Sequence, residues 1–183
     1  MNNKNSNLVI VADEYSQYIN LAIEFAERVL KIKMKVAIFN LTDNAQEELQ
    51  VRTPKNKRNK LYIDRNSDLT IDYIEQKSRE LKAEKKIDVI IIDLEEKEIN
   101  INYKELSKRL KDLSLELGLT IDIFTQIKEN TRVTIIGIED IENEEITDYA
   151  DMVFVNKIND KNKKVAFVAK SNNDKYPVGY LRK

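Results

Sequence analysis

The side chains that could carry chemistry in this chain are carboxylates, because the sequence contains no histidine and no cysteine. Their absence excludes the usual general base, the commonest transition-metal ligand and any thiolate nucleophile. Asp93, Glu95 and Glu96 follow one apolar run, and Asp13 and Asp43 follow two others. Five such carboxylates could together bind Mg²⁺ or Ca²⁺. The alternative, which we favour, is that they are solvated residues near helix starts.

The elements that must position these residues alternate between strands and helices. Apolar runs predict strands at Asn7–Ala12, Lys35–Leu41, Leu61–Asp64, Ile87–Asp93, Thr120–Gln126, Thr131–Ile136, Met152–Val155, Val165–Ala169 and Val178–Leu181. Helical spacing predicts helices at Ser16–Ile32, Thr42–Val51, Thr70–Lys86 and Tyr103–Leu117. Thr53–Lys60 is expected to be a polar loop, and Glu139–Glu145 an acidic one. This order predicts an α/β fold with a mostly parallel central sheet and a β-rich C-terminal extension.

Length and composition favour one domain over residues 1–183, with residues 1–6 as a polar lead-in. The 31 basic and 32 acidic residues leave a formal net charge of −1, so total charge gives no attraction to nucleic acid or membrane. No apolar run approaches the roughly 20 residues of a membrane span. We therefore expect a cytoplasmic protein without a membrane partner.

Glycines are missing where a nucleotide site would need them. Ligands of parallel sheets bind at the carboxyl ends of the strands, and a phosphate-binding turn there needs glycines for close backbone approach. The three glycines are Gly118, Gly137 and Gly179, and the turn after the first strand reads DEYSQYIN. Asp13 and Glu14 would repel a phosphate placed at this turn. The sequence therefore argues against tight ATP binding in the usual pose.

The order of segments resembles the RecA-like motor domain of DnaB-type replicative hexameric helicases, which belong to the P-loop NTPase superfamily. The resemblance runs from about Leu8 to Leu181. It rests on NLVIVA with the helix LAIEFA, on KVAIFNLTDNAQEELQVR, on LYIDRNSDLTIDYIEQKSRELKAEKKIDVIIID, on LSKRLKDLSLELGLTIDIFTQI, on ITDYADMVFV and on VAFVAKSNNDKYPVG. It implies a RecA-like fold, ATP and Mg²⁺ as family cofactors, and ATP-dependent DNA helicase activity in the family.

Several positions depart from the family pattern, and three keep it. The Gly-Lys-Thr of the phosphate loop (Walker A) falls on Gln17, Tyr18 and Ile19. The catalytic glutamate falls on Thr42 and the arginine finger on Asn172, with Asp174 where the same hairpin has glycine. The resemblance keeps the Walker B aspartate as Asp93, the sensor glutamine as Gln126 and the lysine beside the finger as Lys170.

Two functional hypotheses follow from this degenerate site. Phosphoryl transfer needs the lysine, the metal-binding hydroxyl, the base and the finger together, so we expect a pseudoenzyme without ATPase activity and without bound ATP or Mg²⁺. Such a domain would act in DNA replication through a protein partner, such as a replicative helicase or loader, or through self-association. The alternative is an ATP-binding domain with an atypical site, in which Asp93, Gln126 and Lys170 converge on the nucleotide.

Charged and aromatic stretches offer weaker candidates for binding. Lys55, Lys57, Arg58 and Lys60 could contact nucleic acid, although we favour a solvated loop. The segment from Lys157 onward holds eight basic and two acidic residues and is the better candidate for nucleic-acid contact. The acidic loop at 139–145 matches a DNA-facing loop of the motor and would repel a phosphate backbone. Tyr15 and Tyr18 could stack on a base or a partner, or fill the vacated phosphate site.

Overall fold

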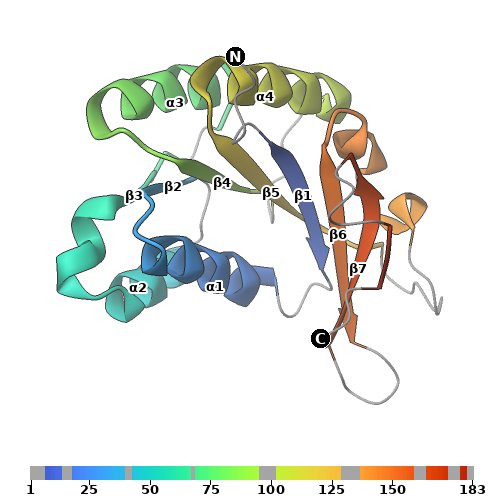
Figure 1. Cartoon of the computed structure of the whole chain (residues 1–183), viewed down its shortest axis with the longest axis horizontal. Coiled ribbons are helices and arrows are strands. Elements are labelled where there is room, and N and C mark those ends of the chain that lie inside the picture. Colours follow the sequence, from blue (N-terminus) through green and yellow to red (C-terminus); the bar gives the residue numbers. More distant parts are fainter. Residues whose placement is uncertain are drawn as a thin grey trace.

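A single eight-stranded sheet organises the chain (Figure 1). The structure is a computed structural model that describes residues 7–13, 18–39, 43–66, 69–94, 102–128, 137–158, 164–172 and 178–180. The strand order is β3-β2-β4-β5-β1-β6-β7-β8. Neighbouring strands from β3 to β6 run parallel, whereas β7 and β8 are antiparallel additions. The predicted α/β class, the mostly parallel sheet and the β-rich C-terminal extension are confirmed.

The strands follow the apolar runs, with ends shifted by a few residues. They are β1 (Leu8–Asp13), β2 (Val36–Phe39), β3 (Leu61–Ile63), β4 (Val89–Asp93), β5 (Thr120–Gln126), β6 (Met152–Ile158), β7 (Lys164–Ser171) and β8 (Gly179–Tyr180). The parallel strands β1, β2 and β4 are buried throughout, as expected of strands covered by helices on both faces. We call the edge where the parallel strands start the amino edge, and the opposite one the carboxyl edge.

Four α-helices connect these strands: α1 (Tyr18–Lys31), α2 (Asp43–Arg52), α3 (Ile71–Lys85) and α4 (Tyr103–Leu117). Local capping fixes the ends of the last two. Thr70 Oγ1 accepts a hydrogen bond from Tyr73 N, and Asn102 Oδ1 accepts one from Glu105 N. Gly118 ends α4 in the left-handed region (φ 61°), where glycine carries no Cβ penalty.

The helices form one layer on each face of the sheet, with α1 and α2 on one side and α3 and α4 on the other (Figure 1). Two apolar groups fill the spaces between these layers. One contains Ile10, Ile92 and Ile123 with the inner sides of α3 and α4. The other contains Val11, Ile91 and the inner side of α1. Alternate residues of each strand therefore belong to opposite layers.

Three expectations changed or lie outside the description. Lys55–Lys60 is a 3₁₀ helix, η2, and not an irregular loop. The expected acidic loop contains two short 3₁₀ helices, η3 (Ile138–Asp140) and η4 (Glu144–Thr147). The strand expected at 131–136 and the lead-in at 1–6 lie outside the described residues. Among the residues that are described, no helix is long and apolar enough to cross a membrane.

Candidate functional site

The carboxyl edge of the three central strands gathers the residues that the sequence singled out. β1 ends at Asp13, β4 at Asp93 and β5 at Gln126. Asp13 pairs with Gln126 across the β1–β5 ladder, and Asp93 pairs with Phe124 across β4–β5. Asp13 is 5% exposed and Asp93 is fully buried. Two carboxylates and one amide therefore share a small region of this edge.

These side chains point toward the layer of α1. Strand residues alternate between faces, and Val11, Ile91 and Phe124 all belong to the apolar group under α1. Asp13, Asp93 and Gln126 each lie two residues further along the same strands, so they share that face. The resemblance puts the phosphates on this side, beside the turn that leads into the first helix. The retained Asp93 and Gln126 therefore lie where the resemblance puts them.

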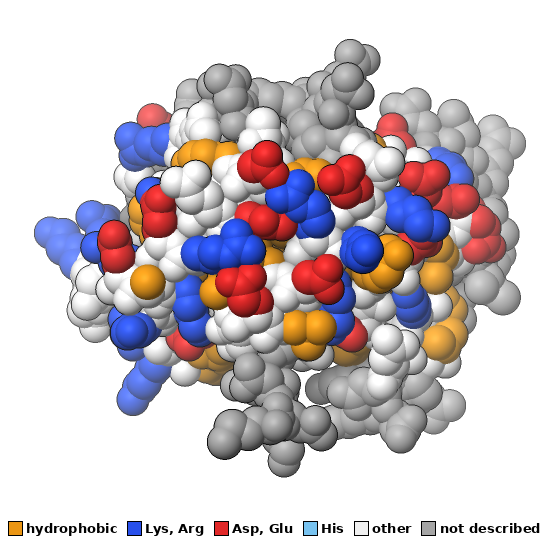
Figure 2. Space-filling view, turned by 90° about the horizontal axis from the view of Figure 1, so that it is seen from above, with side chains coloured by type: hydrophobic (Ala, Val, Ile, Leu, Met, Phe, Trp, Pro, Cys, Tyr) orange, Lys and Arg blue, Asp and Glu red, His pale blue; other side chains and the backbone are white. Residues whose placement is uncertain are grey.

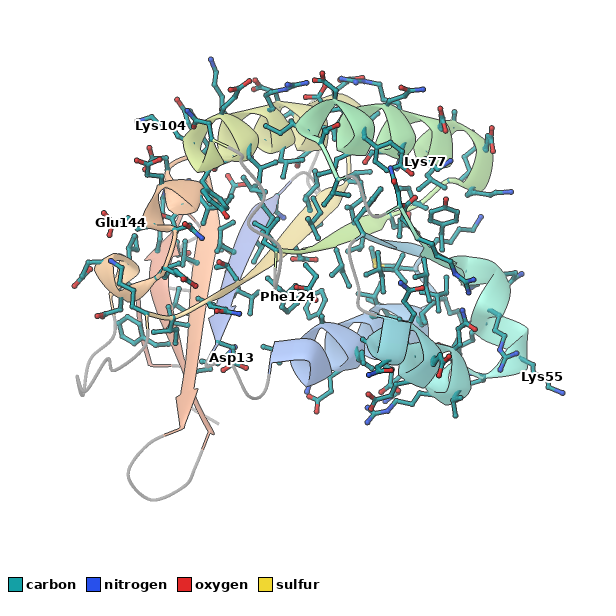
Figure 3. The ribbon with its side chains drawn as sticks, turned by 180° about the vertical axis from the view of Figure 1, so that it is seen from behind. Asp13, Lys55, Lys77, Lys104, Phe124 and Glu144 are labelled. Carbon is teal, nitrogen blue, oxygen red and sulfur yellow. The ribbon has the colours of Figure 1, made fainter. Side chains whose placement is uncertain are left out.

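An apolar floor lies directly below the carboxylates. The ring of Phe124 is fully buried and meets Phe25 of α1 edge-on, with ring centroids 6.1 Å apart (Figure 3). Charge in such surroundings is poorly screened, because the effective dielectric constant is lower than in water. A phosphate brought next to Asp13 and Asp93 would meet like charge there. None of the residues that end β1, β2, β4 and β5 is a cation.

The chain leaving β5 turns into the acidic segment and keeps its lysine there. Glu142 N donates to Gln126 O (2.9 Å), and Ile127 forms a bridge with Ile141. Lys128 donates from Nζ to the carbonyl of Glu139, and its Nζ lies 3.5 Å from a carboxylate oxygen of Glu144. The first cation beyond the strand end is therefore held by the acidic segment, which lowers its value as a phosphate ligand.

Lys170 and Asn172 lie at the opposite edge of the sheet. β7 runs antiparallel to β6, so its end returns to the amino edge. Lys170 Nζ donates to the carbonyls of Thr147 (2.8 Å) and Asp148 (3.0 Å). Asn172 N donates to the carbonyl of Asp151, whose own N–H donates to the carbonyl of Leu8. Since Leu8 starts β1 and Asp13 ends it, the two sets are separated by about 16 Å along the strand.

This separation corrects one expectation. The hypothesis of an atypical nucleotide site required Asp93, Gln126 and Lys170 to converge within the chain. Asp93 and Gln126 do lie together, but Lys170 is on another strand at the other edge of the sheet. The position of β7 in the sheet gives the reason, because antiparallel pairing reverses the edge at which a strand ends. A nucleotide bound to one chain at Asp93 would not be reached by Lys170 of that chain.

Several singled-out residues lie outside the described part of the chain. These are Glu14, Tyr15, Gln17, Thr42, Glu95, Glu96 and Asp174. Tyr18 and Ile19 begin α1 and Asp43 begins α2, but their side chains are not described. Among the described residues there is no group of three or more acidic side chains placed to hold a metal ion.

Two buried aspartates were not singled out from the sequence. Asp64 follows β3, and its Oδ2 accepts hydrogen bonds from the hydroxyls of Tyr73 (2.8 Å) and Tyr62 (3.3 Å). Burial, reinforced by Asp64, raises the pKa of both tyrosines. These bonds tie β3 to α3, so Asp64 has a structural role. The signal was weak, because the tyrosine with the shorter bond belongs to the following helix.

Asp122 is the second buried aspartate, and its surroundings are apolar. It pairs with Val9 and Ile91 in mid-sheet under α1 and is 2% exposed. Its Oδ2 has no hydrogen-bond partner among the described residues. Burial raises the pKa of this carboxyl to about 8. Asp122 lies four residues before Gln126 on the same strand, on the side of the amino edge, so it is not part of the carboxyl-edge site.

Comparisons with known proteins bear on the fold. A scan against protein-family models found no match, and a search of curated proteins found none either. Among solved structures, the chain is similar to the ATPase domain of a DnaB-like helicase, with a TM-score of 0.71, 15% identity, and coverage of 96% of this chain and 80% of that one. This likeness supports the RecA-like fold. The fold is shared by 288 matching chains, so it does not by itself decide the activity.

Proposed function

We propose that this chain is a non-catalytic domain of RecA-like fold, related to DnaB-type helicase motors, that acts through association and not through ATP hydrolysis. The observation that carries the proposal is the buried pair Asp13 and Asp93 above the ring of Phe124. At this place an ATPase needs a lysine and a metal-binding hydroxyl. The sequence has Tyr18 and Ile19 at the corresponding positions.

The chemistry of hydrolysis supports the same conclusion. Phosphoryl transfer is catalysed almost entirely by positioning and by cations that offset the developing charge. The described strand ends of the carboxyl edge present anionic and apolar groups. The two candidate charge donors of the finger hairpin, Lys170 and the position of Asn172, lie at the amino edge. Among the described residues of one chain, no set of cations can therefore surround a transferred phosphoryl group.

The proposed role is association within DNA replication, with a replicative helicase, its loader or a second copy of this chain as the partner. This part rests on the resemblance of the sequence and on the fold of the ATPase-domain neighbour. Its test is a binding measurement against each candidate partner, with self-association followed by light scattering. A dissociation constant in the micromolar range or below would support it. Absence of binding to every partner and of self-association would leave the role without support.

Calorimetric titration with ATP and Mg²⁺, together with phosphate release in the presence of single-stranded DNA, tests the loss of activity. We expect no heat of binding up to about 1 mM nucleotide, the upper end of ordinary Michaelis constants. The matched variant is Asp93→Asn, which removes the charge of the retained Walker B position without changing its size. Wild-type binding that this substitution abolishes, or release stimulated by DNA, would refute the pseudoenzyme.

One observation favours the alternative of an ATP-binding domain with an atypical site. Asp93 and Gln126 are both retained and lie at the ends of adjacent strands, β4 and β5. In that case a neighbouring chain would have to supply the cations, because Lys170 of the same chain is too distant. The same titration distinguishes the two, since binding would then depend on protein concentration as well as on Asp93.

A further inference from the structure

The amino edge of strands β2, β3 and β4 is surrounded by exposed cations. Lys31 ends α1, Lys33 lies in the turn before β2, Lys55 and Arg58 belong to η2, and Lys85 and Lys86 end α3. All six are exposed. We call these six residues the amino-edge basic surface. They come from three segments of the sequence that span more than fifty residues, so only the folded sheet brings them to one edge.

Hydrogen bonds connect the segments that carry this surface. Lys60 Nζ donates to the carbonyl of Lys33 (3.0 Å), which joins η2 to the turn before β2. Lys35 Nζ donates to the carbonyl of Lys85 (2.7 Å), which joins that turn to the end of α3. Arg58 also donates to the carbonyl of Gln50 (3.1 Å). The six cations therefore belong to one continuous region, which reaches the end of the molecule where Figure 3 labels Lys55.

The amino-edge basic surface is not neutralised by neighbouring carboxylates. No carboxylate oxygen in the described residues lies within 4.0 Å of the side-chain nitrogens of these six residues. The outer face of α3 and α4 is different, because Arg79 and Arg109 are each paired with two or more carboxylates. Figure 2 shows the interleaved charges of that face and the blue side chains gathered at the left end.

Helix-end electrostatics explains only part of this surface. Cations are stabilised at helix C-termini, which accounts for Lys31 and Lys85. Lys55 and Arg58, however, do not end an α-helix. Lys33 (φ 68°) and Lys86 (φ 57°) also occupy left-handed positions, where glycine would be less strained. Two lysines at strained positions of one edge indicate that their charge has a use.

From this surface we propose that the amino edge binds the phosphate backbone of duplex nucleic acid without reading its sequence. Five of the six residues are lysines, which act as point charges and can meet phosphates in many orientations. Sequence-independent binding of this kind depends on phosphate contacts and on the release of counterions. No aromatic residue belongs to the surface, so the base stacking that holds single strands is missing. The proposal is independent of the proposed loss of ATPase activity.

Other anionic partners fit the surface less well. Lysine is depleted in protein–protein interfaces, where aromatic residues and arginine dominate. The two exposed large apolar residues of α1–α2 and the following turn, Ile32 and Val51, are aliphatic. A membrane surface would also need an apolar helix face to insert, and α2 has none of that kind, with Leu49 and Ala45 buried in the core. We therefore commit to nucleic acid.

The test is fluorescence anisotropy with a labelled random duplex of about 30 base pairs, at about 50 mM and about 200 mM salt. The wild-type chain is expected to bind with micromolar affinity at the lower salt and roughly a thousandfold more weakly at the higher, as six phosphate contacts imply. The variant Lys31→Gln/Lys55→Gln/Lys85→Gln should bind about tenfold or more weakly at the lower salt. Its salt slope should fall by about 3, since each lost phosphate contact removes about 1.

The matched control removes the same charge elsewhere, through Lys77→Gln/Lys104→Gln/Lys108→Gln on α3 and α4. It should change the affinity by less than about threefold, because total charge contributes little at this distance and salt. All substituted side chains are at the surface, and thermal unfolding checks that both variants fold. Equal losses in both variants, or no duplex binding by the wild-type chain, would overturn the proposal. Binding only to anionic phospholipid vesicles, lost in the first variant, would overturn it as well.

Discussion

Replacing Asp122 by asparagine should remove most of the pH dependence of stability between about pH 5 and about pH 7. Burial raises the pKa of this carboxyl to about 8, whereas an unfolded aspartate titrates near 3.9. Between these values the folded chain keeps the proton and the unfolded chain releases it. The folded state then binds more protons, so the free energy of unfolding falls as pH rises. The Asp122 contribution is complete below about pH 4 and is lost by about pH 8.

The magnitude follows from the width of this window. Each pH unit inside it costs about 1.4 kcal/mol, so the wild-type chain should lose about 3 kcal/mol between pH 5 and pH 7. This range is unusually clear of other titrations, because the chain has no histidine. Hydrogen bonds from arginine lower the pKa of Glu75 and Glu116. Both therefore titrate below this window and lose their stabilising effect only as pH falls through their lowered pKa.

Urea unfolding followed by circular dichroism, at several pH values and constant ionic strength, measures the effect. Asp122→Asn keeps the size of the side chain and cannot ionise, so its free energy of unfolding should be nearly flat over the window. Asp112→Asn is the matched control, because Asp112 is exposed on α4. The control should retain the wild-type slope. Parallel pH curves for the wild-type chain and Asp122→Asn would show that Asp122 is ionised in the folded state, against the reasoning from burial.

Three further predictions concern the scaffold, and each is measured by urea unfolding. Gly118→Ala should cost about 1 kcal/mol, because alanine is strained at φ 61°; an unchanged midpoint would mean that the end of α4 rearranges freely. Arg109→Met should cost about 1 kcal/mol through lost pairs with Asp72 and Glu75 at 2.5 and 2.8 Å, less at high salt; a salt-independent loss would point to packing instead. Asp151→Ala should cost about 2 kcal/mol or more, because its carboxylate accepts bonds from Leu8 N and a lysine of α4; a neutral result would mean that water replaces both bonds.

The strands and helices could be predicted from the sequence because their signals are local. Runs such as Val89–Asp93, and the spacing of leucines through α4, define elements within a few residues. The 3₁₀ helix at Lys55–Lys60 has no buried residue and hence no apolar period. It is held by distant groups, as in the bond from Lys60 to the carbonyl of Lys33. Such contacts are invisible in a local pattern.

The site could be predicted in part. Asp93 and Gln126 were placed at strand ends by the order of apolar runs, and the pairing of β4 with β5 confirms that they lie at neighbouring strand ends. The position of Lys170 could not be derived, because it depends on β7 running antiparallel to β6. Asp122 was missed for a related reason. A polar residue that alternates with apolar ones looks solvent-facing, and only the strand order reveals that α1 covers that face.

The distribution of charge over the two edges of the sheet explains how this chain can keep the fold without the activity. The packing of the sheet depends on apolar runs that the chain retains, so the fold survives changes at the strand ends. A nucleotide site needs cations at the carboxyl edge, where this chain buries Asp13 and Asp93. The exposed cations of the amino-edge basic surface lie instead beside the starts of β2, β3 and β4. If the chain binds phosphates, the amino edge is therefore the side from which they are attracted, and hydrolysis at the carboxyl edge is not required.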